Sequence, residues 1–153
     1  MAQDSIEPLE TLPCGEFAFP GPLRDALVTA ILNGTKTTTT SLLVEHPRDH
    51  DPCEDVGTLE AVLDSRDNVV CVIRTTEVQI CRLADVSDEH AIAEGEGYAD
   101  VSEWRAGHEQ FWRSPEFVEY IGGLDISDDT QVVCQRFTVD GRYPVKALKP
   151  WGS

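Results

Sequence analysis

The sequence predicts an α+β fold, a small and mostly antiparallel β-barrel with flanking helices. Two observations predict this class. The segments with helical or strand-like patterns follow one another as a helix, two strands, several short helices and a last strand. This order lacks the regular strand–helix–strand alternation that indicates a parallel sheet. The length of 153 residues is enough for one domain with a real core, so no second domain is needed.

The first element is a helix expected over residues 22–33. Leu27 and Ile31 lie one turn apart on one face, and Pro22 suits a first helical turn. Gly34 follows at the position where a left-handed residue commonly ends a helix. The chain should therefore turn sharply there, so that Lys36 leaves the helix from a fixed point.

Four threonines and a serine follow Lys36, and we expect them to be extended, because β-branched residues disfavour continuing a helix. In this arrangement Lys36 and Thr39 can converge across the bend. A lysine can act as the base that activates a threonine hydroxyl, which is otherwise a weak nucleophile. The same residues also fit an ordinary edge strand, with Lys36 as a solvated charge beyond a helix end, where a cation is favourable.

The remaining elements are predicted from alternation, caps and glycine stops. Strands are expected over residues 58–63, 69–80 and 130–139, the second of them long enough to bend or to cross a barrel. Ser87, Asp100 and Ser114 are placed as helix N-caps. In the helix after Asp100, Trp104 and His108 share a face with a later aromatic residue, which indicates core packing with His108 at its edge.

Charge and cysteine content exclude several classes of function. With 28 acidic against 12 basic residues, the net charge of −16 disfavours duplex DNA and long nucleic acids, which are bound largely through phosphate neutralisation. Five cysteines without a C-x-x-C pair argue against a disulfide scaffold or a thiolate zinc site. No apolar run has the length of a membrane span and the first residues do not resemble a signal peptide, so we expect a cytoplasmic protein without membrane contact.

The expected organisation is a loosely ordered arm over residues 1–16, one domain over residues 17–140 and a basic tail over residues 141–153. Residues 45–55 form a polar loop with two histidines and several acids. His46 and His50, with Asp49 and Asp51, are residue types that bind divalent ions. The loop lacks a spacing that fixes coordination geometry, so we expect no metal and no cofactor.

Several short motifs, in this order, resemble the ASCH-domain family, a relative of the PUA fold, and specifically its longer bacterial branch. The resemblance covers roughly residues 17–139. It rests on Gly34-Thr35-Lys36 with the threonines and Ser41-Leu42, Asp55-Val56-Gly57, the strand Val72 to Val78, Ala93-Glu94-Gly95-Glu96-Gly97, Trp104-Arg105 with His108, and Val132 to Phe137. It implies a PUA-like β-barrel with a cleft that faces RNA or a nucleoside.

The family's activities are more varied than its fold. Short members include amidohydrolases that remove the acetyl group of acetylcytidine with a lysine, a threonine three residues later and a glutamate. The match carries these catalytic roles onto Lys36, Thr39 and Glu94. This chain departs from those enzymes at Ser41, where they have an arginine, and Glu96 could take the role of Glu94. Other members are single-strand ribonucleases or RNA binders.

We therefore expect an amidohydrolase acting on the exocyclic amine of an acylated cytidine, with a single-strand ribonuclease or a non-catalytic RNA-binding module as the alternative. A small-molecule sensor that keeps the cleft without catalysis is a third possibility. The expected partner is a modified nucleoside or a short single-stranded RNA. Residues expected to bind it are Thr37, Ser41, Arg74, Glu96, Trp104, Arg105 and His108.

Overall fold

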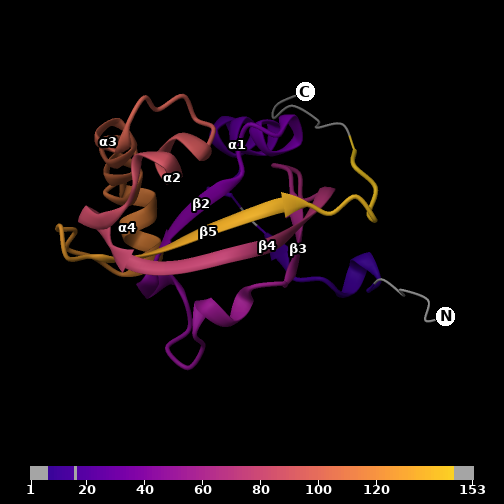
Figure 1. Cartoon of the computed structure of the whole chain (residues 1–153), viewed down its shortest axis with the longest axis horizontal. Helices are drawn as coiled ribbons and strands as arrows, with labels where there is room; N and C mark the ends of the chain where they lie inside the picture. Colours follow the sequence, from indigo (N-terminus) through magenta and orange to yellow (C-terminus); the bar gives the residue numbers. More distant parts are fainter. Residues whose placement is uncertain (1–6, 16, 147–153) are drawn as a thin grey trace.

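The computed structural model describes residues 7–15 and 17–146, which form one five-stranded sheet and four α-helices (Figure 1). In the sheet the strand order is β1-β3-β4-β5-β2. The strands are β1 (Cys14–Gly15), β2 (Thr38–Leu42), β3 (Leu59–Leu63), β4 (Val69–Arg82) and β5 (Gln131–Val139). The helices are α1 (Pro22–Asn33), α2 (Asp88–Ala93), α3 (Val101–Trp112) and α4 (Pro115–Ile121).

The expected α+β class is confirmed, but the sheet is mixed. β3, β4, β5 and β2 pair in antiparallel fashion, whereas β1 runs parallel to β3. Over the described residues β1 and β2 are the two edges of the sheet, so a closed barrel is not confirmed. The parallel pair arises because residues 14 and 15, which the sequence analysis assigned to a loose arm, lie along the edge of β3.

The first helix has the predicted bounds and the predicted stop. Gly34 has φ of 81°, a left-handed conformation that glycine adopts without steric cost. The amide of Lys36 returns to the carbonyl oxygen of Ala30 at 3.0 Å, which completes the turn. Val28 and Ile31 are buried from α1 against Phe137 of β5. The helix thereby fixes the start of the link to β2.

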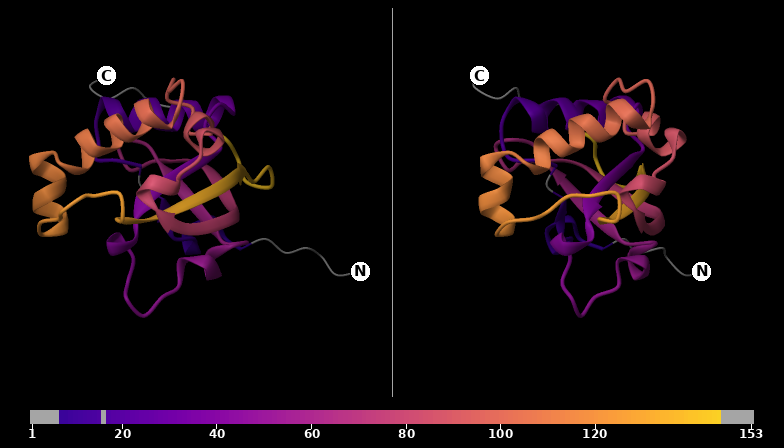
Figure 2. Two further views of the ribbon diagram at one scale, coloured as in Figure 1. Left: turned by 60° about the vertical axis from the view of Figure 1, so that its left-hand side comes forward. Right: turned by 90° about the vertical axis from the view of Figure 1, so that its left-hand side faces the viewer.

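The long strand β4 bends where the sequence analysis allowed for a bend. Its pairing with β5 shifts register between Thr75 and Glu77, as at a β-bulge. Its first part also pairs with β3, and its last part lies near α2, α3 and α4, which gather at one end of the sheet (Figure 2). The core at that end is built mainly from Leu42, Leu83, Trp104, Trp112, Phe117 and Val132.

Side-chain caps position the three later helices as predicted. Ser87, Asp100 and Ser114 each accept a hydrogen bond from a backbone amide in the first turn. No helix in the described part of the chain is long and apolar enough to cross a membrane. In the polar loop, residues 43–45 and 52–55 form short 3₁₀ turns.

Parts of both predicted terminal segments are attached to the sheet. The hydroxyl of Tyr143 donates to the carbonyl oxygen of Glu7 at 2.7 Å, and Leu12 and Tyr143 share a small core. The amide of Lys146 donates to the carbonyl oxygen of Val70 at 2.8 Å. The rest of the predicted arm and tail lies outside the described residues.

Gly95 lies where the end of α2 meets the link between α1 and β2. A Cβ atom at Gly95 would lie 2.5 Å from the carbonyl oxygen of Thr35 and 2.7 Å from the amide nitrogen of Lys36, and its φ is 72°. The amide of Thr37 also donates to the carbonyl oxygen of Ala93 at 2.9 Å. Backbone contacts backbone here, so only glycine lets the two segments approach.

We predict that Gly95→Ala lowers the free energy of unfolding by about 2 to 4 kcal/mol, because it combines strained φ with a backbone clash. The matched control is Gly97→Ala. Gly97 has φ of 89°, but a Cβ atom there would meet nothing within 4 Å, so only the conformational strain of about 1 kcal/mol applies. Urea unfolding measures both; equal losses in the two variants would contradict the close approach.

Candidate functional site

A buried carboxylate, that of Glu94, is the centre of the site. Glu94 directly follows α2, and its side chain is 1% exposed. One carboxylate oxygen accepts hydrogen bonds from the Thr40 hydroxyl at 2.6 Å and the Trp104 indole at 2.7 Å. The other lies 3.1 Å from Nε2 of His108 and 3.6 Å from Nζ of Lys36. Buried charge of this kind requires such partners.

Lys36 reaches Glu94 from the turn that Gly34 creates. Its side chain is also 1% exposed, and Nζ donates to the carbonyl oxygen of Thr38 at 2.8 Å and to that of Glu94 at 3.4 Å. These two carbonyls accept hydrogen bonds from the ammonium group, and the Glu94 carboxylate, 3.6 Å from Nζ, balances its charge. The lysine is therefore held as one half of a buried ion pair.

Strand alternation decides which threonines face the site. The hydroxyl of Thr38 donates to the carbonyl oxygen of His90 at 3.0 Å, and that of Thr40 donates to Glu94. Nε2 of His90 lies 2.7 Å from the same Thr40 oxygen. Because the Thr40 proton is directed at Glu94, His90 fits as the donor to Thr40 through Nε2–H. Thr38 and Thr40 thus connect β2 to α2.

His108 stacks on the Trp104 ring, with ring centroids 4.4 Å apart. Its Nδ1 lies 3.0 Å from the carbonyl oxygen of Trp104, which can only accept a hydrogen bond. Nδ1–H therefore donates there, and Nε2 faces Glu94 as a donor when the ring is protonated. Burial lowers the pKa of His108, but the hydrogen bond and charge of Glu94 outweigh burial and leave this pKa above its ordinary value.

The same contacts set the charge of Glu94. Burial by itself raises the pKa of a carboxyl group. The hydrogen bond from His108, the ring of His90 with Nε2 3.4 Å away, and the charge of Lys36 together outweigh burial, so the pKa of Glu94 lies well below its ordinary value. Glu94 is consequently an anion beside Lys36 and His108, and a poor proton donor at neutral pH.

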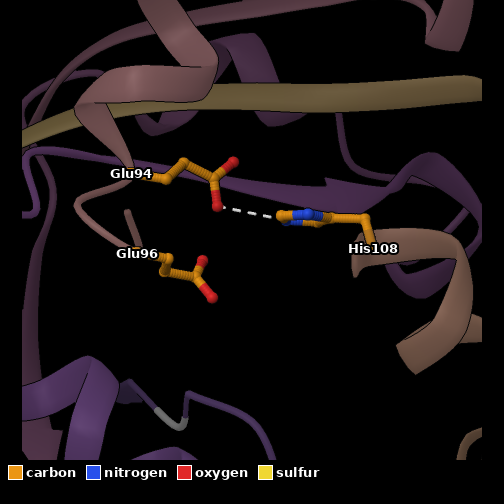
Figure 3. Close-up of side chains that lie close together, drawn as sticks. All are labelled: Glu94, Glu96 and His108. Atoms are coloured by element: carbon orange, nitrogen blue, oxygen red, sulfur yellow. Dashed lines mark ion pairs between the residues drawn. The ribbon is translucent and has the colours of Figure 1, made fainter. Parts of the chain in front are cut away.

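A second carboxyl group, that of Glu96, lies beside this pair at the surface. Glu94 and Glu96 project side by side from the turn after α2 toward His108 of α3 (Figure 3). Desolvation and the charge of Glu94 raise the pKa of Glu96. The charge of Lys36 lowers this pKa, but the net shift is upward. Tyr98 is next to Glu96, and burial with the two glutamate charges raises the pKa of Tyr98 to about 12.

Among the described residues, Glu94, Glu96 and His108 are the group whose ligand atoms lie close enough to hold one ion, all within 4.8 Å of one another. The carboxylate oxygens of Glu94 already contact Thr40, Trp104 and His108, and the Lys36 ammonium, 3.6 Å away, opposes a second cation. The donor set therefore fits a network of ion pairs better than a metal centre.

The comparisons with known proteins now decide the family. The family model for the ASCH domain matches residues 16–140. This chain belongs to the ASCH domain family. A search of curated proteins found no match.

Two solved structures are similar to this ASCH domain. One is an ASCH domain from Lactobacillus crispatus JV V101, with 24% identity and a TM-score of 0.71 over 84% of this chain and 79% of that chain. The other is a protein from Enterococcus faecalis V583 described by the family model DUF984. It has 26% identity and a TM-score of 0.72 over 90% of this chain and 78% of that chain. Both likenesses support the fold.

The structure brings together Lys36, Glu94, Glu96, Trp104 and His108, all of which the sequence analysis of this ASCH domain selected. Thr37 contributes through its backbone, which bonds to the end of α2.

Four other selected residues do not join this cluster. Thr39 alternates with Thr38 and Thr40 and so lies on the other face of β2, where Ser41 contacts His46 at 2.8 Å. Arg74 pairs with Asp140, and Arg105 pairs with Glu109 and Asp128. The expected convergence of Lys36 with Thr39 is therefore not seen. Lys36 instead contacts the backbone of Thr38, and the hydroxyl of Thr40 reaches the carboxylate of Glu94.

Two site residues, Thr40 and His90, were missed. His90 carries a signal in the sequence, because it lies one helical turn before Glu94, whereas the threonine run gives none for Thr40. The histidines that the sequence analysis did consider as metal ligands lie elsewhere, where His50 pairs with Asp55 at 2.7 Å and His46 contacts Ser41.

We predict that His108→Gln destabilises this domain by about 2 kcal/mol near pH 6, from the loss of a buried charged hydrogen bond, and by less near pH 9. The pKa of His108 is raised in the folded state. The stability that its charge contributes is therefore complete below the pKa of the unfolded state and is lost as the pH rises through the pKa of the folded state. Unfolding in urea at several pH values measures this. His50→Gln, at an exposed pair, is the control and should change stability little at either pH. A pH-independent loss in His108→Gln would contradict the imidazolium.

Proposed function

We propose that this ASCH domain hydrolyses the amide formed on the exocyclic amine of an acylated cytidine or a closely related nucleoside. The observation that carries the proposal is the buried Lys36–Glu94 pair with a second, exposed carboxyl group at Glu96. Two carboxyl groups whose surroundings move their pKa values apart are a common arrangement for acid–base chemistry. The family resemblance adds an amidohydrolase activity to this chemistry.

The electrostatics favour a small, uncharged substrate over a polyanion. Arg74, Arg82, Arg105 and Arg136, whose charges could contact RNA phosphates, are each paired with acids. Arg136 contacts Glu77 and Glu89, and Arg82 contacts Asp85 and Asp129; Arg74 and Arg105 are paired as described above. Since the chain also carries a net charge of −16, phosphates would meet few available cations and much like charge.

The charges of the site suit the steps of amide hydrolysis. Attack of an oxygen nucleophile on the acyl carbon creates negative charge on the carbonyl oxygen, and fixed cations nearby stabilise it. His108, with a side chain 12% exposed, is the cation closest to solvent, and Lys36 lies behind it. The leaving amine also needs a proton, which general acid catalysis supplies.

Water fits the role of nucleophile better than Thr39. The Thr39 hydroxyl lies on the face of β2 opposite to Thr40 and Glu94, whereas Thr40 already donates to the carboxylate. A threonine nucleophile needs its base within hydrogen-bonding reach. Lys36 instead donates to the carbonyl oxygens of Thr38 and Glu94 and forms an ion pair with the Glu94 carboxylate.

We predict that the protein converts N4-acetylcytidine to cytidine and acetate, as measured by chromatography of the nucleosides. Thr40→Val should lower kcat by about tenfold or more, because Glu94 loses a charged hydrogen bond worth about 1.5 to 3 kcal/mol. Thr39→Val, the matched variant one residue away, should stay within about threefold of the parent, an energy change below about 1 kcal/mol. Absence of turnover in the parent refutes the proposal, and loss of nearly all turnover in Thr39→Val makes Thr39 the nucleophile.

We also predict weak binding of a generic single-stranded RNA at physiological salt, with a dissociation constant above about 10 µM, because Arg74, Arg82, Arg105 and Arg136 are already paired with acids. Fluorescence anisotropy with a labelled oligonucleotide at two salt concentrations measures this affinity. Submicromolar affinity that falls steeply with salt would favour the ribonuclease or RNA-binding alternative instead.

A further inference from the structure

Exposure separates the charged groups of the site into two layers. The side chains of Lys36 and Glu94 are each 1% exposed, and that of His108 is 12% exposed. Glu96, by contrast, is an exposed residue. A molecule that arrives from solvent therefore meets Glu96 and the edge of His108 before it can reach Glu94.

The two glutamates also differ in the partners they have. Glu94 accepts from donors on β2 and α3, and its carboxylate needs no further support. Glu96 faces the charge of Glu94 from its own turn, His108 from α3, Lys36 from the link to β2 and the Tyr98 hydroxyl. When two carboxyl groups lie this close, they do not both ionise easily, and the proton stays on the one with weaker support. Here that one is Glu96.

The position of Glu96 is fixed by the backbone on both sides. Gly95 holds the turn between the two glutamates in a left-handed conformation against Thr35 and Lys36. On the other side Tyr98 packs on α3 so closely that a Cβ atom at Gly107 would touch its hydroxyl oxygen. Glu96 is therefore held in place beside His108 (Figure 3).

We propose that Glu96 is the carboxyl group that touches the substrate and carries the proton, and that Glu94 is a positioning residue behind it. This inference rests on the amide hydrolysis proposed above. It divides between two residues the role that the family resemblance places on Glu94 alone.

Glu96 carries one proton from the attacking water to the leaving amine. As the oxygen of water bonds to the acyl carbon, one O–H bond breaks and its proton passes to the ionised Glu96. The protonated Glu96 then gives this proton to the exocyclic nitrogen as the C–N bond breaks. The products are the nucleoside amine and a carboxylic acid, which releases its own proton to solvent, and Glu96 is again ionised.

The test compares the parent with Glu96→Gln and Glu96→Asp for hydrolysis of N4-acetylcytidine over a range of pH. In the parent kcat/KM should rise with pH as Glu96 ionises. Glu96→Gln should lose about 100-fold or more of kcat/KM together with this rise, while its melting temperature stays close to that of the parent. Glu96→Asp should keep the pH dependence at a lower rate. The matched control Glu89→Gln, a glutamate of α2 with an 84% exposed side chain, should match the parent.

A binding measurement separates failure of this inference from failure of the proposed function. Calorimetry of cytidine binding in two buffers of different ionisation heat reports proton exchange, which Glu96 should cause in the parent and Glu96→Gln should abolish.

An active parent with Glu96→Gln within threefold of it overturns the role of Glu96 and leaves the hydrolysis standing. An inactive parent whose cytidine binding exchanges protons only when Glu96 is present overturns the hydrolysis and supports the contact. An inactive parent that binds cytidine without proton exchange, or does not bind it, overturns both.

Discussion

The buried carboxylate of Glu94 is the interaction on which the rest of the site depends. An anion that is 1% exposed is stable only with several donors, and these come from separate segments of the chain. Lys36 comes from the link after α1, Thr40 from β2, and Trp104 and His108 from α3. The charge therefore couples the placement of these segments, because loss of any donor leaves the carboxylate short of a partner.

This coupling explains why two backbone features, at Gly34 and Gly95, are needed to position the charged side chains. The left-handed turn at Gly34 directs Lys36 inward, and Gly95 allows the end of α2 to touch the backbone of Thr35 and Lys36. Without the second contact the ammonium and the carboxylate would separate, and each would be a buried charge without its main partner. The aromatic core of α3 likewise positions a donor at the carboxylate, because Trp104 is both a fully buried core residue and a donor to Glu94.

The site also shows how one segment can hold two glutamates in different surroundings. Glu94 and Glu96 are two residues apart on a tight turn, yet one has its oxygens filled by donors and the other opens to solvent. A saturated carboxylate gives rigidity and a fixed charge, whereas a partly solvated one can gain and lose a proton. Around them, acids pair with the surface residues Arg74, Arg82, Arg105 and Arg136.

The sequence by itself determined the helices, their caps and most strand bounds, because these depend on neighbours within a few residues. It also determined the family and five members of the cluster, Lys36, Glu94, Glu96, Trp104 and His108, through motifs in order along the chain. Tertiary structure alone decided which threonine hydroxyl reaches the carboxylate, that residues 14 and 15 add a parallel edge strand, and that Arg105 and Arg136 are paired with acids. These outcomes depend on register and on contacts between segments far apart in sequence, such as Thr40 with Glu94. A run of four threonines gives no local signal for its register, and only the pairing of β2 with β5 sets which face each one takes.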